Sequence, residues 1–361
     1  MISRYVAVIL CLLTVSSTIQ AASHSWLFVS LLRAKKIVTF HRDSTTGVLQ
    51  RRGETTCPAE PAFLSVSPDR KTLFASYRST GQLASFRINA SNGTLTPLSV
   101  VEGGEDPAYL LADRTGRFLL SAYYLANKVT VHRLAANGMI GETPLQTIPT
   151  AEKAHGFVLD SNNRMAFVPH TGGNRIYQFQ FNAQNGRLSA SDPAFTATPA
   201  VDHPRHIALH PSDRWAYVSN EAGDSVGVFA VDQKQGTLQR IQTMSTLPAG
   251  FDGSTNATAR CEITPNGKFV YIANRGHDSL AGFAIDPQTG KVRSLGQTLT
   301  EKTPRSFSIE PQGKFLYAAG ESSGRIAAYR IGTDGHLTRI ATYESGPVSW
   351  WALAVDTPSA N

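Results

Sequence analysis

Ionisable side chains recur at two corresponding places from residue 155 onward in this chain. Some stand at the start of a short apolar run and the others at the end of the aromatic-rich run that follows; they are His155, His170, Arg205, Glu221, Arg275, Arg305 and Glu321. An imidazole or a carboxylate can take a proton from water, and guanidinium groups bind carboxylates, phosphates and developing oxyanions. The combination indicates a site that either activates water or binds a small anion.

The elements that must position these side chains are clearest in residues 201–279, which hold two successive copies of one pattern. The copies read HPRHIALHPSDRWAYVSNEAGDSVGVFAVDQKQGTL and TARCEITPNGKFVYIANRGHDSLAGFAIDPQTGKV. Apolar runs separated by Pro-, Asn-, Asp- and Gly-containing bends predict strand, turn, strand, turn, strand, turn, strand in each copy. Arg205 then begins one first strand, while Glu221 and Arg275 end the two second strands.

The same unit recurs through the whole chain. Its closing turn carries a glycine at Gly47, Gly93, Gly138, Gly186, Gly236, Gly290 and Gly335, with separations of 46, 45, 48, 50, 54 and 45 residues. A period in the high forties with about four short strands per unit is typical of propeller blades. The sequence therefore predicts an all-β, seven-bladed β-propeller.

In an antiparallel blade the start of the first strand lies beside the end of the second, so both positions open on one face of the ring. The first-strand starts are Ala62, Ala108, His155, Arg205, Arg260 and Arg305, with Ser349 or Trp350 in blade one. The second-strand ends are Leu31, Tyr77, Tyr123 or Tyr124, His170, Glu221, Arg275 and Glu321. One half of this mouth is predicted to be charged and the other half apolar and aromatic.

Charges in a narrow, partly dry mouth are costly to desolvate unless they are paired. Their convergence therefore favours an anionic ligand or a catalytic site. The alternative is that Arg–Glu pairs only tie neighbouring blades together.

The two ends of the chain are predicted to complement each other. The first unit lacks an opening strand, because Trp26 already belongs to a second strand, and residues 348–355 form a surplus opening strand. Their pairing closes the ring in one blade and gives a single domain over residues 23–361. Cys57 and Cys261 fall three blades apart, so we expect two free thiols, because a disulfide requires Cα atoms within roughly 7 Å.

Residues 1–22 are typical of a cleaved signal peptide, with Arg4, an apolar run over residues 5–15 and small residues before the cleavage point. The run is too short to span a bilayer, so we expect an exported protein, periplasmic or secreted, that does not contact a membrane. Without Arg4 the net charge falls from +7 to +6, with no basic run, which argues against nucleic-acid binding. No phosphate-loop, Cys-x-x-Cys, His-Glu-x-x-His or Gly-x-Ser-x-Gly motif occurs, so neither a cofactor nor a metal is expected.

The pattern resembles the seven-bladed propeller lactonases, which include bacterial 6-phosphogluconolactonase and fungal carboxymuconate cyclase. The most specific segments are PRHIALHP with SNE, TLPAGFDGSTNATA and FVYIANRGHDSLAGFAID. The resemblance implies a catalytic set of one His, two Arg and one Glu, which falls on His155, Arg205, Arg275 and Glu221. Arg305, His170, Glu321 and Tyr77 are then expected to contact the substrate, a small anionic lactone.

The implied chemistry leaves several points open. Either His155 or Glu221 is the base that activates water, while the two arginines hold the substrate anion and the oxyanion. The chain departs from the family pattern at His170 and at Arg260 with Glu262, which leaves the substrate undetermined, and an export signal fits poorly with a phosphorylated cytosolic metabolite. The alternatives are a non-catalytic propeller that binds a small anion or a protein partner, and a cyclase that runs lactonisation.

Overall fold

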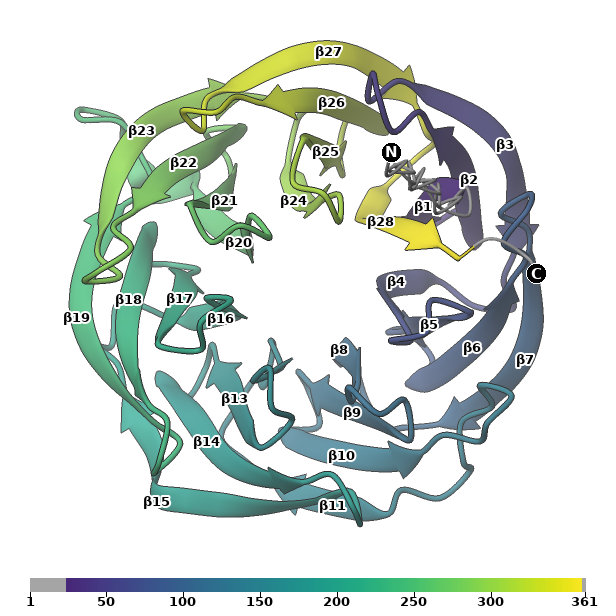
Figure 1. Ribbon diagram of the computed structural model, residues 1–361, viewed down its shortest axis with the longest axis horizontal. Helices are drawn as coiled ribbons and strands as arrows, with labels where there is room; N and C mark the ends of the chain where they lie inside the picture. The colour runs from purple at the N-terminus through teal and green to yellow at the C-terminus, as the bar shows by residue number, and fades with distance from the viewer. Residues whose placement is uncertain (1–23, 359–361) are drawn as a thin grey trace, which may run out of the picture.

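Seven four-stranded antiparallel sheets surround a central axis in the computed structural model (Figure 1), which describes residues 24–358. The innermost strands are β4 (Pro61–Val66), β8 (Pro107–Ala112), β12 (Val158–Leu159), β16 (Pro204–Leu209), β20 (Ala257–Ile263), β24 (Pro304–Ile309) and β28 (Ser349–Thr357). The second strands are β1 (His24–Leu31), β5 (Thr72–Tyr77), β9 (Phe118–Tyr123), β13 (Met165–His170), β17 (Trp215–Asn220), β21 (Phe269–Arg275) and β25 (Phe315–Gly320). The predicted seven-bladed propeller is confirmed.

The outer half of each sheet completes the blade. The third strands are β2 (Lys36–Arg42), β6 (Gln82–Ile88), β10 (Lys128–Arg133), β14 (Arg175–Asn182), β18 (Ser225–Asp232), β22 (Ser279–Ile285) and β26 (Arg325–Ile331). The fourth strands are β3 (Leu49–Thr56), β7 (Leu95–Glu102), β11 (Gln146–Pro149), β15 (Arg187–Ala197), β19 (Thr237–Ser245), β23 (Val292–Leu299) and β27 (Leu337–Glu344). A 3₁₀ turn, η1 (Gly253–Thr255), precedes β20.

The seven recurring glycines lie where each blade packs closely against the preceding blade. Each has φ between 68° and 89°, a conformation that side chains other than glycine rarely adopt. A Cβ atom at Gly290 would lie 2.3 Å from the Trp215 ring, and one at Gly335 would lie 2.4 Å from the Phe269 ring, each belonging to the preceding blade. The recurring glycines therefore mark the positions at which each blade packs closely against the preceding one.

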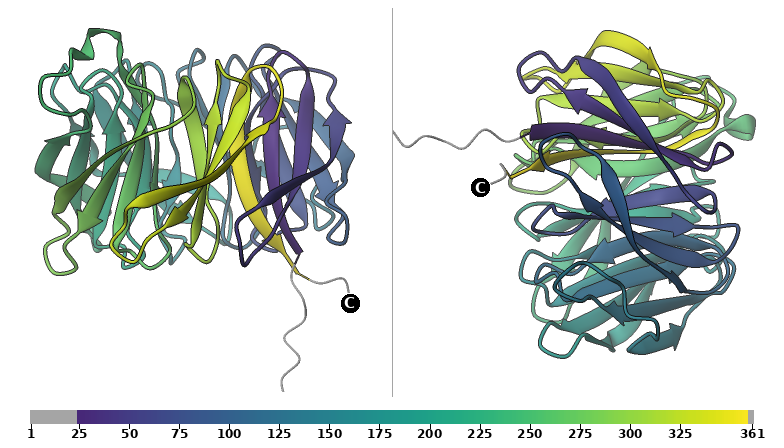
Figure 2. Two further views of the ribbon diagram at one scale, coloured as in Figure 1. Left: turned by 90° about the horizontal axis from the view of Figure 1, so that it is seen from above. Right: turned by 90° about the vertical axis from the view of Figure 1, so that its right-hand side faces the viewer.

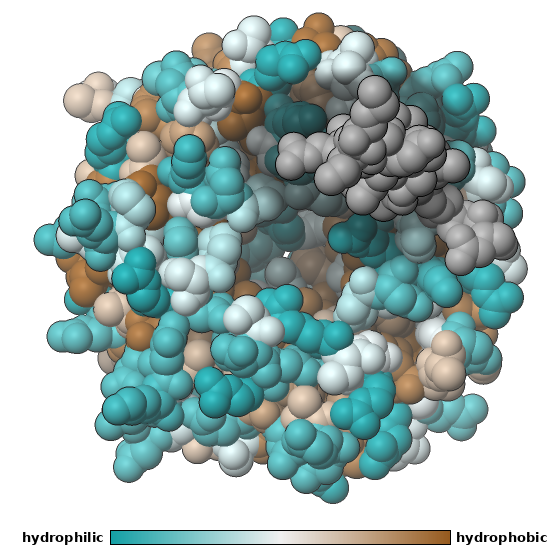
Figure 3. Space-filling view, in the orientation of Figure 1, coloured by the Kyte–Doolittle hydropathy of each residue, from teal (hydrophilic) through white to brown (hydrophobic). Residues whose placement is uncertain are grey.

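The N-terminal and C-terminal strands share one blade, as predicted. β28 pairs with β1 from His24↔Thr357 to Leu31↔Ser349, so the sheet order is β28-β1-β2-β3. β1 begins and β28 ends on the same face of the ring (Figure 2), which we call the termini face. Leu31 and Ser349 lie on the opposite face, which we call the mouth face. The space-filling view of the termini face is hollowed at the axis (Figure 3).

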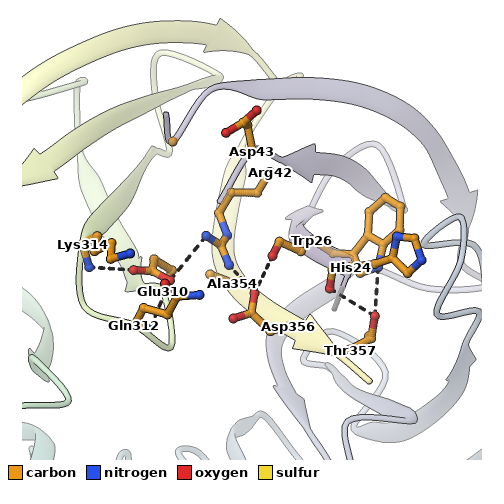
Figure 4. A network of polar contacts seen from close by, with 12 residues as sticks. His24, Trp26, Arg42, Asp43, Glu310, Gln312, Lys314, Ala354, Asp356 and Thr357 are labelled. Atoms are coloured by element: carbon orange, nitrogen blue, oxygen red, sulfur yellow. Dashed lines mark hydrogen bonds and ion pairs between the residues drawn. The ribbon is translucent and has the colours of Figure 1, made fainter. Parts of the chain in front are cut away.

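A buried ion network holds this closing blade to blade seven (Figure 4). Arg42 at the end of β2 is fully buried, donates to Asp356 in β28, and lies 3.4 Å from Glu310, the residue after β24. Ser25 also donates to Asp356, at 2.8 Å. Because charges this deep are stable only when paired, the network ties the closing strand to two blades.

Two further predictions concern single residues and segments. Cys57 and Cys261 are both buried and unbonded to one another, as expected. The predicted signal peptide lies outside the described residues. In the described part of the chain, no helix is long and apolar enough to cross a membrane.

Candidate active site

Several of the residues that the sequence analysis brought together lie on the mouth face, where innermost strands begin and second strands end; they are His155, Arg205, Glu221, Arg275, Arg305 and Glu321. β16 pairs Pro204 with Asn220 and then His206 with Ser219, so Arg205 is an extra, bulged residue without a partner. β24 repeats this arrangement around Arg305. A bulge re-aims the side chain of its extra residue, and here the two guanidinium groups reach Glu221 and Glu321, which directly follow the second strands of the same blades.

Glu221 is the acidic centre of this site. Its Oε1 accepts a hydrogen bond from Arg275 and lies 3.5 Å from Nε of Arg205. Arg275 also donates to the backbone carbonyls of Thr258, at 3.1 Å, and Ala257, at 3.3 Å. Burial pushes the pKa of Glu221 upward, but the charges of Arg205 and Arg275 outweigh it, so the pKa lies below its usual value. Glu221 is an ionised carboxylate shared by two cations.

Arg205 is the least satisfied cation of the set. Only 2% of the residue is exposed, and its Nε and Nη1 are enclosed without a hydrogen-bond partner among the described residues. Burial lowers its pKa well below the usual value, the charge of Glu221 opposes this, and Arg275 and Arg305 add to the lowering. A buried guanidinium with unpaired N–H groups is costly, and the negative charge of an anion in the mouth would offset part of this cost.

His155 lies at the same level in blade four. Its backbone N–H donates to the carbonyl of Pro169 at 3.0 Å, and its ring is 5.6 Å from that of Tyr124 and 5.0 Å from that of His206. The side chain is buried, and Nδ1 has no partner among the described residues. Burial, and next the charge of Arg205, lower its pKa well below 6.5. His155 is therefore a neutral imidazole that can accept a proton.

The structure corrects the placement of Tyr77 and His170. Pro61 pairs with Tyr77 and Ala154 with His170, as Pro204 pairs with Asn220, the residue before Glu221. Both residues therefore occupy the position one before that of Glu221. Because side chains alternate along a strand, a shift of one residue turns them to the opposite face of the sheet.

The contacts of these two residues agree with this register. His170 packs against Tyr177 with ring centroids 4.7 Å apart, its Nδ1 lies 2.8 Å from the carbonyl of Val168, and burial lowers its pKa to about 3. Tyr77 is fully buried in the same apolar cluster as Cys57. Neither residue lines the mouth.

Two mouth residues were missed or left undecided by sequence reasoning. Arg78, not Tyr77, corresponds to Glu221 in blade two, and its guanidinium binds Asp106 through Nε and Nη2. Trp350, which the sequence left as an alternative to Ser349, lies beneath Arg305, with 3.6 Å from the guanidinium carbon to the ring centroid. Arg305 also donates to Glu321 of the same blade, at 3.2 Å. A charge directly after Tyr77 was the signal for Arg78.

A layer of rings lies below these groups in the channel. Phe63 contacts Tyr109 and Trp351 with centroids 4.1 and 4.3 Å apart, and His206 contacts the same two rings at 5.6 and 5.7 Å. Arg260 belongs to this layer and not to the mouth, because the pairs Thr258↔Asn274 and Cys261↔Ile272 place it level with His206. It stacks on Trp351 at 4.5 Å and binds Glu262 at 3.3 Å.

Comparison with known proteins gives one consistent result. The model of the family "Lactonase, 7-bladed beta-propeller" matches residues 27–353. The chain is 35% identical over 302 residues to 6-phosphogluconolactonase of Pectobacterium carotovorum, covering 83% of this chain and 90% of that one. It is 31% identical over 309 residues to the enzyme of the same name from Serratia proteamaculans, covering 85% and 92%.

A solved structure agrees with these relatives. The periplasmic gluconolactonase of Pseudomonas aeruginosa superimposes with a TM-score of 0.85 and 25% identity, covering 93% of this chain and all of that one. No cluster of three or more potential metal ligands occurs within residues 24–358. The chain belongs to the seven-bladed β-propeller lactonase family.

Proposed function

We propose that this protein is a carboxylic-ester hydrolase that opens the lactone of a sugar acid. The names of its relatives support this reaction, and one observation in the site carries it. Arg205 is buried with two unpartnered nitrogens beside a carboxylate that Arg275 already holds. A site built in this way is complementary to negative charge that develops during the reaction, more than to a neutral ground state.

The proposed chemistry needs no group from outside the chain. Water attacks the lactone carbonyl while His155 takes the proton, and the tetrahedral oxyanion is stabilised by the N–H groups of Arg205 and Arg275. The ring C–O bond then breaks, His155 returns the proton to the departing alkoxide oxygen, and an open-chain hydroxy acid results. Glu221 pairs with both guanidinium groups and keeps them in place, so the role of the base falls to His155, whose Nδ1 has no partner among the described residues.

We also propose that the mature protein acts after export. The signal-like segment over residues 1–22 supports this location, as does the periplasmic origin of the gluconolactonase from Pseudomonas aeruginosa. The substrate is then a lactone that occurs outside the cytoplasm. Fractionation of cells that express the full chain tests the location, and recovery of an uncleaved protein in the cytosol would contradict it.

A pH-stat assay over a panel of aldonolactones and uronolactones tests the proposed reaction. Wild-type protein should release acid faster than spontaneous hydrolysis, and His155→Asn should lower the enzymatic rate by about 100-fold or more. If no lactone is turned over while small anions bind saturably, the protein is a binding module. If the reverse reaction from a hydroxy acid is faster under physiological conditions, the protein is a cyclase that uses the same residues.

A further inference from the structure

A group of exposed cations lies on the termini face, in adjoining turns and strand ends of blades two and three. The group consists of Arg70, Lys71, Arg87, Arg114 and Arg117. Among the described residues none of them forms an ion pair, whereas Arg205, Arg275 and Arg305 at the mouth are all paired with carboxylates. Hydrophilic residues predominate on this face (Figure 3). The cations come from separate turns, so they form no basic run in the sequence.

The carboxylates of the same turns are engaged with the main chain. Asp69 accepts a hydrogen bond from the backbone N–H of Lys71 at 3.1 Å. Asp113 is fully buried and accepts from the backbone N–H groups of Arg117 and Phe118, each at 2.8 Å. These carboxylates hold the turns in shape and contact none of the cationic side chains, so the region keeps a positive charge that is available to a partner.

The arginines of this group are held in place by carbonyl groups. Nη1 of Arg70 donates to the carbonyl of Asp356 at 3.2 Å, and Nε of Arg114 donates to that of Asp160 at 2.6 Å. Arg117 likewise donates to a backbone carbonyl of blade four. Within the described chain, Nε and Nη2 of Arg70 and Nη1 of Arg114 make no hydrogen bond and are not enclosed. A carbonyl fixes a guanidinium group without cancelling its charge, so these N–H groups can bind an anion.

The cations border two adjoining hollows. One has a volume of about 750 Å³, and its lining includes Arg70, Lys71, Arg87, Thr72 and Asn137. The other has a volume of about 740 Å³, and its lining includes Arg114, Arg117, Ser67, Thr72 and Thr115. The hollows share Asp69, Thr72 and Ala136, and we call the two together the basic groove. Its hydroxyl and amide groups can bond to neutral hydroxyl groups of a partner.

The lining of the basic groove favours a polymer of sugar acids over other polyanions. Proteins that lie on a bilayer insert apolar side chains, and proteins that bind single-stranded nucleic acid stack bases on aromatic rings. In the described turns of the termini face, the large apolar side chains that are exposed are Val48 and Met139, and neither is aromatic. A chain of uronic acids instead offers a carboxylate on each sugar for the cations and hydroxyl groups for the polar lining.

We propose that the basic groove binds an anionic polysaccharide, whose carboxylates pair with the cations of blades two and three. The groove lies on the face opposite His155 and Arg205. The proposal therefore does not depend on the proposed lactonase reaction, and it gives the termini face a binding partner of its own.

Calorimetric titration with polygalacturonate, a polymer of one uronic acid, tests the proposal, with dextran as the neutral polymer. Wild-type protein should bind polygalacturonate and not dextran, and the affinity should fall as salt is added, because exposed charges are screened. A groove variant should bind polygalacturonate about 10-fold or more weakly, since three exposed charge contacts are lost. This variant carries Lys71→Gln, Arg87→Gln and Arg114→Gln. Absence of binding by the wild-type protein would overturn the proposal.

A matched control removes the same charge from another part of the termini face. It carries Lys268→Gln, Lys291→Gln and Lys314→Gln, in turns of blades six and seven. These lysines are exposed, line neither hollow, and form no ion pair among the described residues. The control should keep its affinity for polygalacturonate within about 3-fold of wild type. Equal losses in the two variants would show attraction to the overall charge of the protein and would refute the basic groove.

A double variant guards against misfolding. Lys71→Gln with Arg87→Gln removes two side chains that make no hydrogen bond within the described chain, and it should still weaken binding by about 3-fold or more. All three variants should keep the wild-type Tm, because every substituted side chain is exposed.

Two other outcomes separate the possible partners and functions. Tighter binding of duplex DNA or of anionic lipid vesicles than of polygalacturonate would overturn the choice of partner. Wild-type protein that binds polygalacturonate through the groove but hydrolyses no lactone would contradict the proposed function and support this proposal.

Discussion

Replacing Arg205 by Met should lower the catalytic rate strongly while it changes the free energy of unfolding little. Methionine fills much of the same space but carries no charge. The change removes a buried guanidinium with two unpartnered nitrogens, each of which costs about 1–3 kcal/mol where it stands. It also removes one of the two cations beside Glu221, at a contact of 3.5 Å, while Arg275 remains. These effects oppose each other, so we expect the free energy of unfolding to change by less than about 1 kcal/mol.

Activity should respond very differently. Loss of one preorganised oxyanion donor typically costs about 3 kcal/mol of transition-state stabilisation, or about 100-fold or more in kcat. Thermal melting and lactone kinetics on the same Arg205→Met preparation therefore give the decisive comparison. Full activity with a strongly lowered Tm would refute the reasoning and leave Arg205 as a tie between blades.

Arg42 provides the matched control for this experiment. It is equally buried and also has two nitrogens, Nε and Nη1, without a hydrogen-bond partner, but it pairs with two carboxylates, Asp356 and Glu310, and neither has another arginine beside it in the described chain. Arg42→Met should therefore cost several kcal/mol of unfolding free energy, on the order of 3–5, while the kinetics of the folded fraction stay near wild type. The same substitution thus has opposite expected consequences at the two sites.

Three other predictions follow from the site and the closure. Arg275→Met should lower both stability and activity, because Arg275 also donates to two backbone carbonyls of β20; an unchanged Tm would contradict those bonds. The plot of kcat/KM against pH should stay at its plateau well below pH 6.5, because the pKa of His155 is lowered and the base must be unprotonated. A loss of kcat/KM with a midpoint at or above pH 6.5 would exclude His155 as the base. A chain ending at Ser345 should not fold cooperatively, since β1 then lacks its inner partner; an unchanged melting midpoint would refute the closure.

The fold was predictable because its signals are local and repeated. Each blade needs a glycine where its third and fourth strands connect, since a side chain at Gly290 or Gly335 would collide with an aromatic ring of the neighbouring blade. Seven such constraints at nearly equal spacing leave little freedom in the number of blades. The first unit lacks its innermost strand, and the C-terminal segment is a surplus innermost strand. The C-terminal strand was therefore expected to pair with the first unit.

The site was predictable only where charge marked the end of a strand. Glu221 and Arg275 are charged residues that follow corresponding apolar runs, each directly after an asparagine, so their alignment was clear. In blade two the run ends in Tyr77-Arg78, and Tyr77 was chosen although Arg78 occupies the position of Glu221. In blade four His170 was chosen because it is polar, although Thr171 occupies that position. The bulge that places Arg205 at the mouth leaves no mark in sequence composition, because it depends on which backbone pairs form.

The placement of the first residue of β1 and the last residue of β28 on the termini face has a practical consequence. His24 and Thr357 pair with each other, and the eight residues of β1 separate them from Leu31 by roughly 25 Å at ordinary strand rise. A surface, a resin or a fused domain attached beyond either strand would thus hold the ring with its mouth face turned outward. Immobilisation through one end should leave the access of small lactones to Arg205 and His155 unobstructed, whichever end is used.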